Sequence, residues 1–159
     1  MNPDVRSLLT EAQISVLRQG YSRAMMNVVA TKLVAAPYPP VAGLVAFAGD
    51  RFYNEAPPVL GHADRERVLI GIFAAGRRPA FALAVHAYWG LMEGLTVDEI
   101  AEIIVLASLY GGIDVLTDSM RTLGDSLRQM AKAAEAGGDA AASQVLLPAL
   151  VAAFRPSAG

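Results

Sequence analysis

The sequence predicts an all-α fold, an orthogonal or antiparallel bundle of about six to seven helices. Apolar residues recur at intervals of three and four along most of the chain, which is typical of helices that bury one face. No stretch alternates apolar and polar residues, and no Asn-Gly or Asp-Gly hairpin turn occurs. Short loops rich in Gly and Pro separate the periodic segments, which favours antiparallel neighbours. The 159 residues suit a single domain, residues 1–159, with a real core.

The first expected helix begins at Asn2-Pro3, because Asn is a good N-cap and Pro is well placed at the first helical position. We expect it to continue to about residue 36, with Gly20 as its weak point. The prolines of residues 37–40 stop it. A shorter helix over residues 41–53 follows, and then a loop reaches residue 62.

Three helices are expected in the middle of the chain. Asp64 caps the first, over residues 65–75, and a tight connection with Pro79 leads to the second, over residues 79–93. Gly94 ends that helix. Thr96 and Glu99 have the spacing of a capping box, which starts the third helix and carries it to about residue 110.

The remaining segments give two more helices. Gly111-Gly112 predicts a sharp turn, followed by a helix over residues 113–136 and a loop over residues 137–139. A last helix spans residues 140–154, and Pro148 breaks or kinks it. Asp114, at the start of the helix after the turn, is a candidate N-cap.

Composition excludes several classes of function. The net charge is −2 with no basic stripe, which argues against nucleic-acid binding. The absence of cysteine removes disulfides, thiolate metal sites and thiol redox chemistry. Two histidines without suitably spaced carboxylates predict no metal site. The apolar runs are shorter than the ~20 residues of a membrane span, and no signal peptide is recognisable, so a cytoplasmic protein is expected. Apolar residues make up 54% and charged residues 18%, an excess that favours burial against other subunits.

His86 is the strongest candidate for a catalytic residue. It is the only ionisable side chain in the apolar stretch of residues 79–92. Ala82 and Gly90 lie one turn before and after it on the same helix face, and both are too small to cover an imidazole. The sequence therefore predicts an open apolar recess beside a group that titrates near neutral pH. The alternative is a core histidine bonded to a backbone carbonyl or to Tyr88.

The order of motifs around His86 resembles the carboxymuconolactone decarboxylase family, which is related to the alkylhydroperoxidase D proteins. The motifs are Arg65-Glu66-Arg67 at the head of an apolar helix, His86 with Gly94 eight residues later, Thr96-x-x-Glu99-Ile100 and Tyr110-x-Gly112. The resemblance covers about residues 64–120. It implies an alkylhydroperoxidase D-like helical fold, a histidine in the active site and no cofactor.

Two departures from the family pattern narrow the range of reactions that we expect. The cysteine positions of the peroxidase branch fall on Pro79 and Ala82, so its thiol relay is excluded. The glutamate of that branch, counted along the chain, falls on Arg67, with Glu66 as its neighbour. The decarboxylase branch, which lacks the cysteines and has Arg-x-Arg, fits better. Asp114 stands where the family usually has proline, which affects one wall of the site.

The candidates for substrate binding are two arginines, two aromatic residues and one glutamate. Arg67 or Arg78 would hold a substrate carboxylate, the alternative being surface charge or ion pairs. Trp89 and Tyr110 would line the pocket, the alternative being core or subunit interface. Glu93 would orient the imidazole through a ligand or water, the alternative being a solvated helix end.

Two main functions remain open at this point, with a thiol-independent peroxidase as a distant third. The first is a cofactor-free lyase or isomerase that acts on a small carboxylated or lactone-type cyclic substrate, with His86 moving a proton. The second is a non-catalytic helical oligomer that binds a small ligand or a partner protein. Both predict a homo-oligomer, and the family resemblance implies a trimer or hexamer.

Overall fold

The structure is a computed structural model, and it describes residues 4–24, 43, 44, 47, 51, 59–77 and 79–154. The expected all-α fold is confirmed, because every regular element in these ranges is helical. The α-helices are α1 (Glu11–Gln19), α4 (His62–Ala75), α5 (Ala80–Met92), α6 (Val97–Gly111), α7 (Ile113–Ala136) and α8 (Ser143–Phe154). Two short 3₁₀ helices, Val5–Ser7 and Gly138–Ala141, precede α1 and α8.

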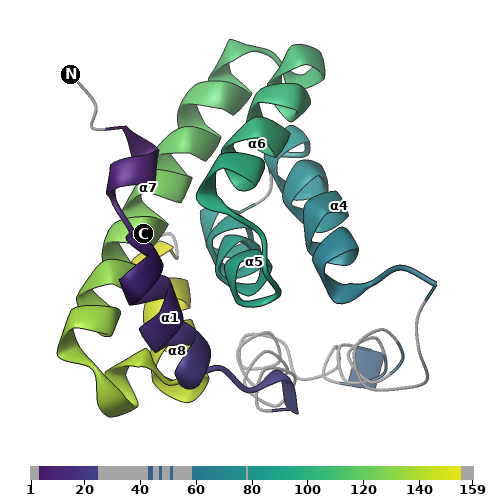
Figure 1. The fold of residues 1–159 in the computed structure, drawn as a ribbon. Helices are drawn as coiled ribbons and strands as arrows, with labels where there is room; N and C mark the ends of the chain where they lie inside the picture. Colours follow the sequence, from purple (N-terminus) through teal and green to yellow (C-terminus); the bar gives the residue numbers. More distant parts are fainter. Residues whose placement is uncertain are drawn as a thin grey trace.

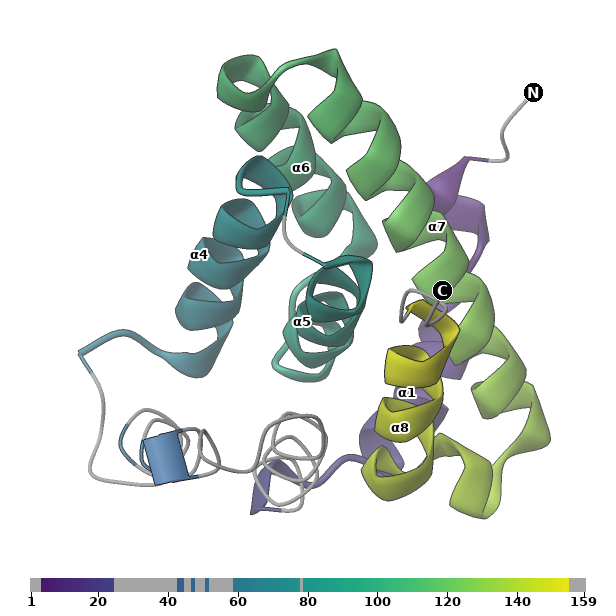
Figure 2. The same ribbon diagram turned by 180° about the vertical axis from the view of Figure 1, so that it is seen from behind.

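Helix α5 lies at the centre of the described part of the bundle. It contacts α4, α7 and α8 most closely, and Figures 1 and 2 show α4 and α7 on opposite sides of it. Its sequence is apolar all round, which is typical of a helix without a solvent face. The buried residues of α5 are Leu83, Ala84, Val85, Ala87, Tyr88, Trp89, Gly90, Leu91 and Met92. Among the described helices, His86 therefore belongs to the one with the largest share of buried residues.

The N-terminal segment differs from the expected long helix. Residues 5–7 form a 3₁₀ turn capped by Asp4, and α1 begins only after Thr10, whose side chain accepts from the Gln13 backbone N–H while Gln13 returns the bond. This capping box fixes the start of α1 after Thr10, although the apolar spacing suggested a continuous helix through this position. The chain leaves α1 at Gly20, where a Cβ would come within 2.7 Å of the Ala141 carbonyl oxygen. Residues 25–36 and most of residues 41–53 lie outside the described ranges.

The middle of the chain follows the predictions except at one helix start. Helix α4 begins at His62 after Gly61, so Asp64 lies in its first turn and is not its N-cap. The capping box of Thr96 and Glu99 is confirmed, with the Glu99 amide 3.1 Å from the Thr96 hydroxyl. Gly94 ends the preceding helix with a φ of 104°, a conformation that favours glycine.

The turn between α6 and α7 also depends on glycine. Gly112 has a φ of 93° and serves as the N-cap of α7, so the predicted sharp turn is confirmed. Because α7 begins at Ile113, Asp114 occupies its first turn and the prediction that it caps the helix is wrong. Helix α8 contains Pro148 within its length.

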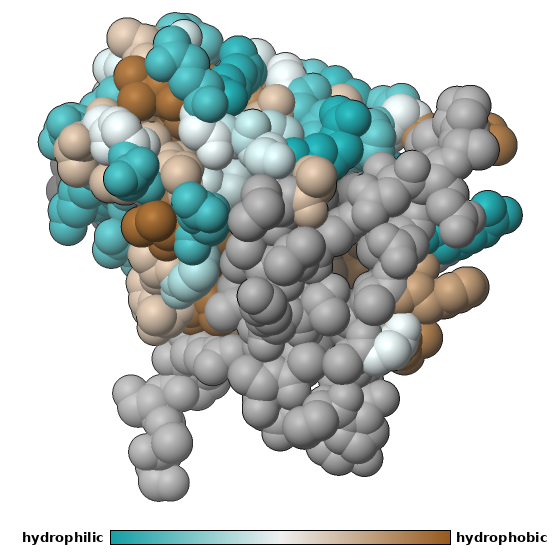
Figure 3. Space-filling model, turned by 90° about the horizontal axis from the view of Figure 1, so that it is seen from below, coloured by the Kyte–Doolittle hydropathy of each residue, from teal (hydrophilic) through white to brown (hydrophobic). Residues whose placement is uncertain are grey.

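The described surface mixes hydrophilic and hydrophobic side chains. Viewed from below, the described residues show hydrophobic spots between larger hydrophilic areas (Figure 3). Within the described ranges, no helix has the length and apolar character needed to cross a membrane.

Candidate functional site

The candidate site is centred on an imidazole that contacts a buried carboxylate. His86 on α5 has its Nδ1 atom 2.7 Å from Oε2 of Glu66 on α4. The Glu66 side chain is 1% exposed and that of His86 is 13% exposed. A carboxylate is rarely buried without a strong partner. The two residues therefore form a dyad that joins two neighbouring helices.

Two aromatic rings fix the orientation of the imidazole. Phe73, on the last turns of α4, stacks on His86 with ring centroids 4.7 Å apart and an interplanar angle of 29°. Trp89 meets the same ring edge-on at 4.8 Å and 87°. With Glu66 bonded to Nδ1, these contacts leave Nε2 as the nitrogen that can serve a ligand.

The predicted recess beside Gly90 is wrong. A Cβ at Gly90 would lie 3.2 Å from Leu95 and 3.3 Å from Ile70, so packed side chains occupy this space. The reason is the turn at Gly94, which lets the Leu95 amide donate to the Gly90 carbonyl at 2.8 Å and folds Leu95 back over α5. Gly90 thus allows close packing of the helix, and the site does not open on that side.

Glu66 is the site residue that sequence reasoning missed. Counting along the chain placed the family glutamate at Arg67 and treated it as lost, but the structure turns the neighbouring Glu66 toward His86. A signal was present in the sequence. Glu66, Ile70 and Ala74 recur at intervals of four, and all three are buried, so the carboxylate belongs to the inward stripe of α4.

Arg67 points to a different group of side chains. Its guanidinium binds Asp64 at 2.7 Å and Glu99 at 2.8 Å. The pKa of Glu99 is lowered, chiefly by the hydrogen bond from Arg67 and then by the Thr96 amide. Glu99 therefore links α4 to α6 in addition to capping α6, which extends the role expected for it. The function of Arg67 as a substrate-binding residue stays a prediction.

Glu93 is engaged by two residues that follow α1. Its carboxylate accepts from Tyr21 at 2.6 Å and from both the Nε and Nη2 atoms of Arg23, at 3.0 and 2.6 Å. Burial by itself raises the pKa of Glu93, but the bonds from Arg23 and Tyr21 outweigh it and lower the pKa. At 10% exposure, the Glu93 side chain is not a solvated helix end. Its orienting role toward His86 stays a prediction.

A second histidine lies in the same electrostatic neighbourhood. Burial lowers the pKa of His62 at the start of α4, and the charge of Arg23 lowers it further. Glu93, Arg65 and Glu66 also act on His62. The sequence indicated no role for His62 or Arg23, because their proximity depends on how α4 and the segment after α1 pack.

The remaining candidates divide between core and surface. Trp89 is 6% exposed and contacts His86, so it forms part of the dyad's surroundings. Tyr110 is 95% exposed near the end of α6, so it lines no enclosed pocket of a single chain. Arg78 lies outside the described residues. Across the described ranges, no group of three or more His, Asp or Glu side chains is placed to hold a metal ion.

A buried carboxylate bonded to one imidazole nitrogen supports proton transfer at the other. When Glu66 is ionised it only accepts, so Nδ1 carries the proton and Nε2 has the free lone pair. The same carboxylate stabilises the imidazolium that forms when Nε2 takes up a proton. Such an arrangement is chemically capable of general acid or base catalysis.

Comparison with known proteins gave one match. The model of the carboxymuconolactone decarboxylase family matches residues 41–125, which is more than half of the chain and begins upstream of the expected region. No curated protein and no solved structure matches the chain.

Proposed function

Because the chain belongs to the carboxymuconolactone decarboxylase family, we propose that it is a cofactor-free lyase or isomerase acting on a small carboxylated or lactone-type cyclic substrate. The observation that carries the proposal is the 2.7 Å contact between His86 Nδ1 and the buried Glu66 carboxylate. A structural histidine needs only one hydrogen-bond acceptor, and a backbone carbonyl supplies one at a lower desolvation cost. A buried carboxylate in that place favours a role in proton transfer.

In the lyase reaction, the substrate loses CO₂ by cleavage of the bond between its carboxylate and the ring. The electron pair of that bond passes into a conjugated carbonyl and forms an enolate. The protonated His86 then delivers a proton from Nε2 to the ring carbon, and Glu66 stabilises the imidazolium until that transfer. In an isomerase, Nε2 first removes a proton from carbon and returns it at another position. Phe73 and Trp89 limit access of water to the imidazole.

The substrate carboxylate requires a cation, and four arginines are candidates. Arg67 and Arg78 are the two that the sequence suggests. Arg67 would have to exchange Asp64 or Glu99 for the substrate. Arg65 and Arg23 are further candidates, because both act electrostatically on His62, as does Glu66 of the dyad.

Two variants test the role of the dyad. On lactones that bear a carboxylate, we expect His86→Ala to lower kcat by roughly 10²- to 10⁴-fold, the usual contribution of a general acid or base. Glu66→Gln keeps the size and one hydrogen bond but removes the charge, so we expect a smaller loss in kcat. Arg128→Gln, on the exposed side of α7, is the matched control. Equal turnover by wild type and His86→Ala would contradict the assignment.

The second part of the proposal is that the chain works as a homo-oligomer, a trimer or hexamer. Helices α4 and α6 pack together and expose apolar side chains on their outer faces. The next copy of the chain is the occupant we assign to this surface, because α4 is apolar on its outer face as well as buried on its inner one. The exposed apolar residues of α4 and α6 are Val68, Ile72, Val105, Leu106, Leu109 and Tyr110.

Sedimentation or light scattering tests the assembly. We expect wild type to sediment as a trimer or hexamer at micromolar concentration. Leu109→Asp, which places a charge at a 72% exposed leucine of α6, should give smaller species. Val145→Asp on α8 is the control, since this exposed valine lies on another helix. A wild type that is monomeric at this concentration would contradict this part of the proposal.

A non-catalytic oligomer is the second candidate function. The packed space beside Gly90 favours it, because the imidazole has less room than the sequence suggested. A pH–rate profile on any substrate that turns over distinguishes the two, because a protein that only binds has no such profile.

A further inference from the structure

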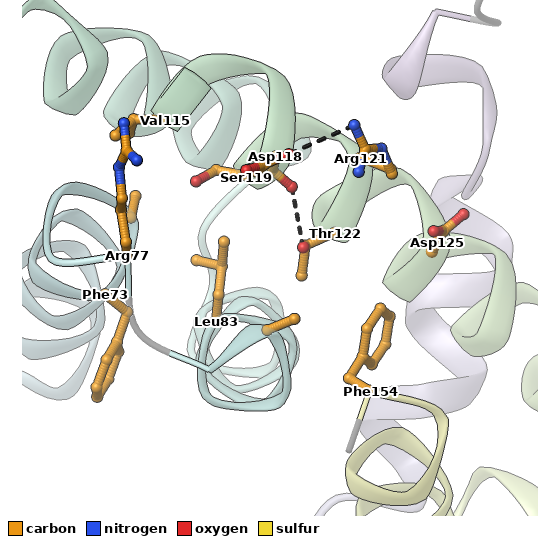
Figure 4. Close-up of a pocket in the computed structure, with 12 residues that line it drawn as sticks. Phe73, Arg77, Leu83, Val115, Asp118, Ser119, Arg121, Thr122, Asp125 and Phe154 are labelled. Atoms are coloured by element: carbon orange, nitrogen blue, oxygen red, sulfur yellow. Dashed lines mark hydrogen bonds and ion pairs between the residues drawn. The ribbon is translucent and has the colours of Figure 1, made fainter. Parts of the chain in front are cut away.

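Phe73 also borders a space that neither residue of the dyad lines. A cavity of about 440 Å³ opens between the end of α4, the start of α5, α7 and the end of α8. This volume is in the range of small-molecule sites. Its walls are apolar where α5, α7 and α8 contribute Leu83, Val115 and Phe154 (Figure 4). Phe73 belongs to this lining and also stacks on His86, but neither His86 nor Glu66 is part of the cavity wall.

Two arginines at this cavity hold their acidic partners loosely. Arg77 lies 3.4 Å from Asp114, and Arg121 lies 3.4 Å from Asp118. On the same helix and with the same spacing, Arg128 binds Asp125 at 2.6 Å. Side chains of the two loose pairs are 62 to 72% exposed. Such exposed pairs contribute little to stability, so a ligand that binds bidentately can replace the aspartate.

The backbone of Arg77 is a second and independent observation. Arg77 has a φ of 47°, and it is the one residue other than glycine with a positive φ in the described ranges. Gly76, which would adopt this conformation without strain, precedes it with a φ of −79°. The chain thus has an arginine where glycine would be less strained. Backbone strain of this kind is concentrated at functional sites, and the side chain of Arg77 belongs to the cavity lining.

A buried hydroxyl supplies a further polar group. Ser119 is 6% exposed and lines the cavity. Three other hydroxyls of α7, those of Thr117, Thr122 and Ser126, donate to the carbonyl one turn earlier. Ser119 makes no such bond, and its hydroxyl lies toward the end of the cavity where Arg77 reaches Val115 (Figure 4).

We propose that this cavity binds a small monocarboxylate with an apolar body, held by Arg77 and Ser119 and covered by Leu83, Val115 and Phe154. The planar guanidinium matches a carboxylate bidentately, and the serine hydroxyl donates to a carboxylate oxygen. Asp118 and Asp125 also line the cavity, so a single negative charge is accommodated better than a multiply charged phosphate. The site is distinct from the dyad, and its occupancy does not depend on turnover.

Calorimetric titration of the full chain with 2-naphthoate, 2-naphthamide and 2-naphthylmethylamine tests the proposal. We expect saturable binding of the carboxylate and at least tenfold weaker binding of the neutral amide and of the amine. Arg77→Gln should lower the affinity for 2-naphthoate about tenfold or more, which is the range for loss of a charged hydrogen bond. Ser119→Ala should lower this affinity several-fold, and Arg128→Gln should leave the affinity unchanged.

Arg77→Gly separates loss of binding from loss of folding. Glycine relieves the positive φ, so Tm should be equal or higher while 2-naphthoate affinity falls as for Arg77→Gln. His86→Ala should bind 2-naphthoate like wild type, which distinguishes this site from the dyad even if no turnover is found. The proposal is overturned if no saturable binding occurs, if the amide binds as tightly as the carboxylate, if the Arg77 variants bind normally, or if His86→Ala abolishes binding.

Discussion

Replacing Glu93 by glutamine should destabilise the fold by about 2 kcal/mol, because a buried charge-assisted cluster loses its anion. Glu93 receives two bonds from Arg23, at 3.0 and 2.6 Å, and one of 2.6 Å from Tyr21. These bonds tie the segment after α1 to the end of α5. Glutamine preserves the shape and can still accept from Tyr21, so the loss isolates the charge.

The magnitude follows from burial. A hydrogen bond to a charged group contributes about 1.5 to 3 kcal/mol when the acceptor is buried. Glu93 is 10% exposed but Arg23 is 45% exposed, which places the expected loss near the lower half of that range. Asp64→Asn is the matched control: its 2.7 Å bond to Arg67 is similarly short, but the two side chains are 58% and 40% exposed. We expect it to change stability by no more than about 0.5 kcal/mol.

The effect of Glu93 also depends on pH in a defined direction. The pKa of Glu93 is lowered in the folded protein. A lowered pKa means that the carboxylate stabilises the fold above its ordinary pKa of about 4.5, and that this stabilisation is lost as pH falls through the folded value. Urea unfolding at pH 7, 5, 4 and 3.5 measures it. The reasoning is refuted if Glu93→Gln costs no more than Asp64→Asn at pH 7, or if its cost does not shrink on acidification.

Three further substitutions test the local structure, each by urea unfolding at pH 7. Gly94→Ala, at a φ of 104°, should destabilise the fold by about 1 to 2 kcal/mol. The control Gly71→Ala, whose Cβ would lie an ordinary 3.6 Å from a side chain, should be neutral or stabilising. Equal effects of the two substitutions on stability would contradict the role of φ. Thr96→Ala should cost about 1 kcal/mol by removing the N-cap of α6, and Thr117→Ala in the exposed part of α7 should cost less. Gly20→Ala should be strongly destabilising, because its Cβ would meet the backbone of Ala141 at 2.7 Å and backbone cannot move aside; a wild-type midpoint would show that this contact is not held.

The predictions that held were those decided within a few residues. Thr96 and Glu99 satisfy each other's backbone amides, and Gly94 and Gly112 adopt the positive φ that their places at helix ends suggest. A second capping box, formed by Thr10 and Gln13, was not predicted from the sequence; in it, glutamine takes the place of glutamate. The apolar spacing on either side suggested one long helix, but periodicity does not register a break as short as residues 8–10, between the 3₁₀ helix and α1.

The predictions that failed depended on neighbours that are distant in sequence. The recess beside His86 was inferred from the small size of Ala82 and Gly90, and on the Gly90 side it is wrong, because the size of Gly90 says nothing about Ile70 and Leu95 packing into the same space. The role of Arg67 as a substrate-binding residue stays a prediction; what its motif did not indicate is its partner Glu99, which comes from α6, thirty-two residues away. Motif order indicated the segments that contribute to the candidate site, and packing between helices decided which groups meet there.

Helix α4 shows how the candidate site and the proposed assembly depend on one element. Its inner stripe contains a carboxylate, Glu66, in the place of an apolar residue, while Val68 and Ile72 are about half exposed on its outer face. An isolated monomer would be more stable with an apolar residue on the inner stripe and polar residues on the outer face. The buried charge costs desolvation free energy, and the exposed apolar groups contribute no burial free energy. Both features become favourable if the carboxylate serves His86 and the outer face is covered by a second copy. Any change that displaces α4 from α5 then lengthens the contact between Glu66 and His86, so assembly and proton transfer are expected to be lost together.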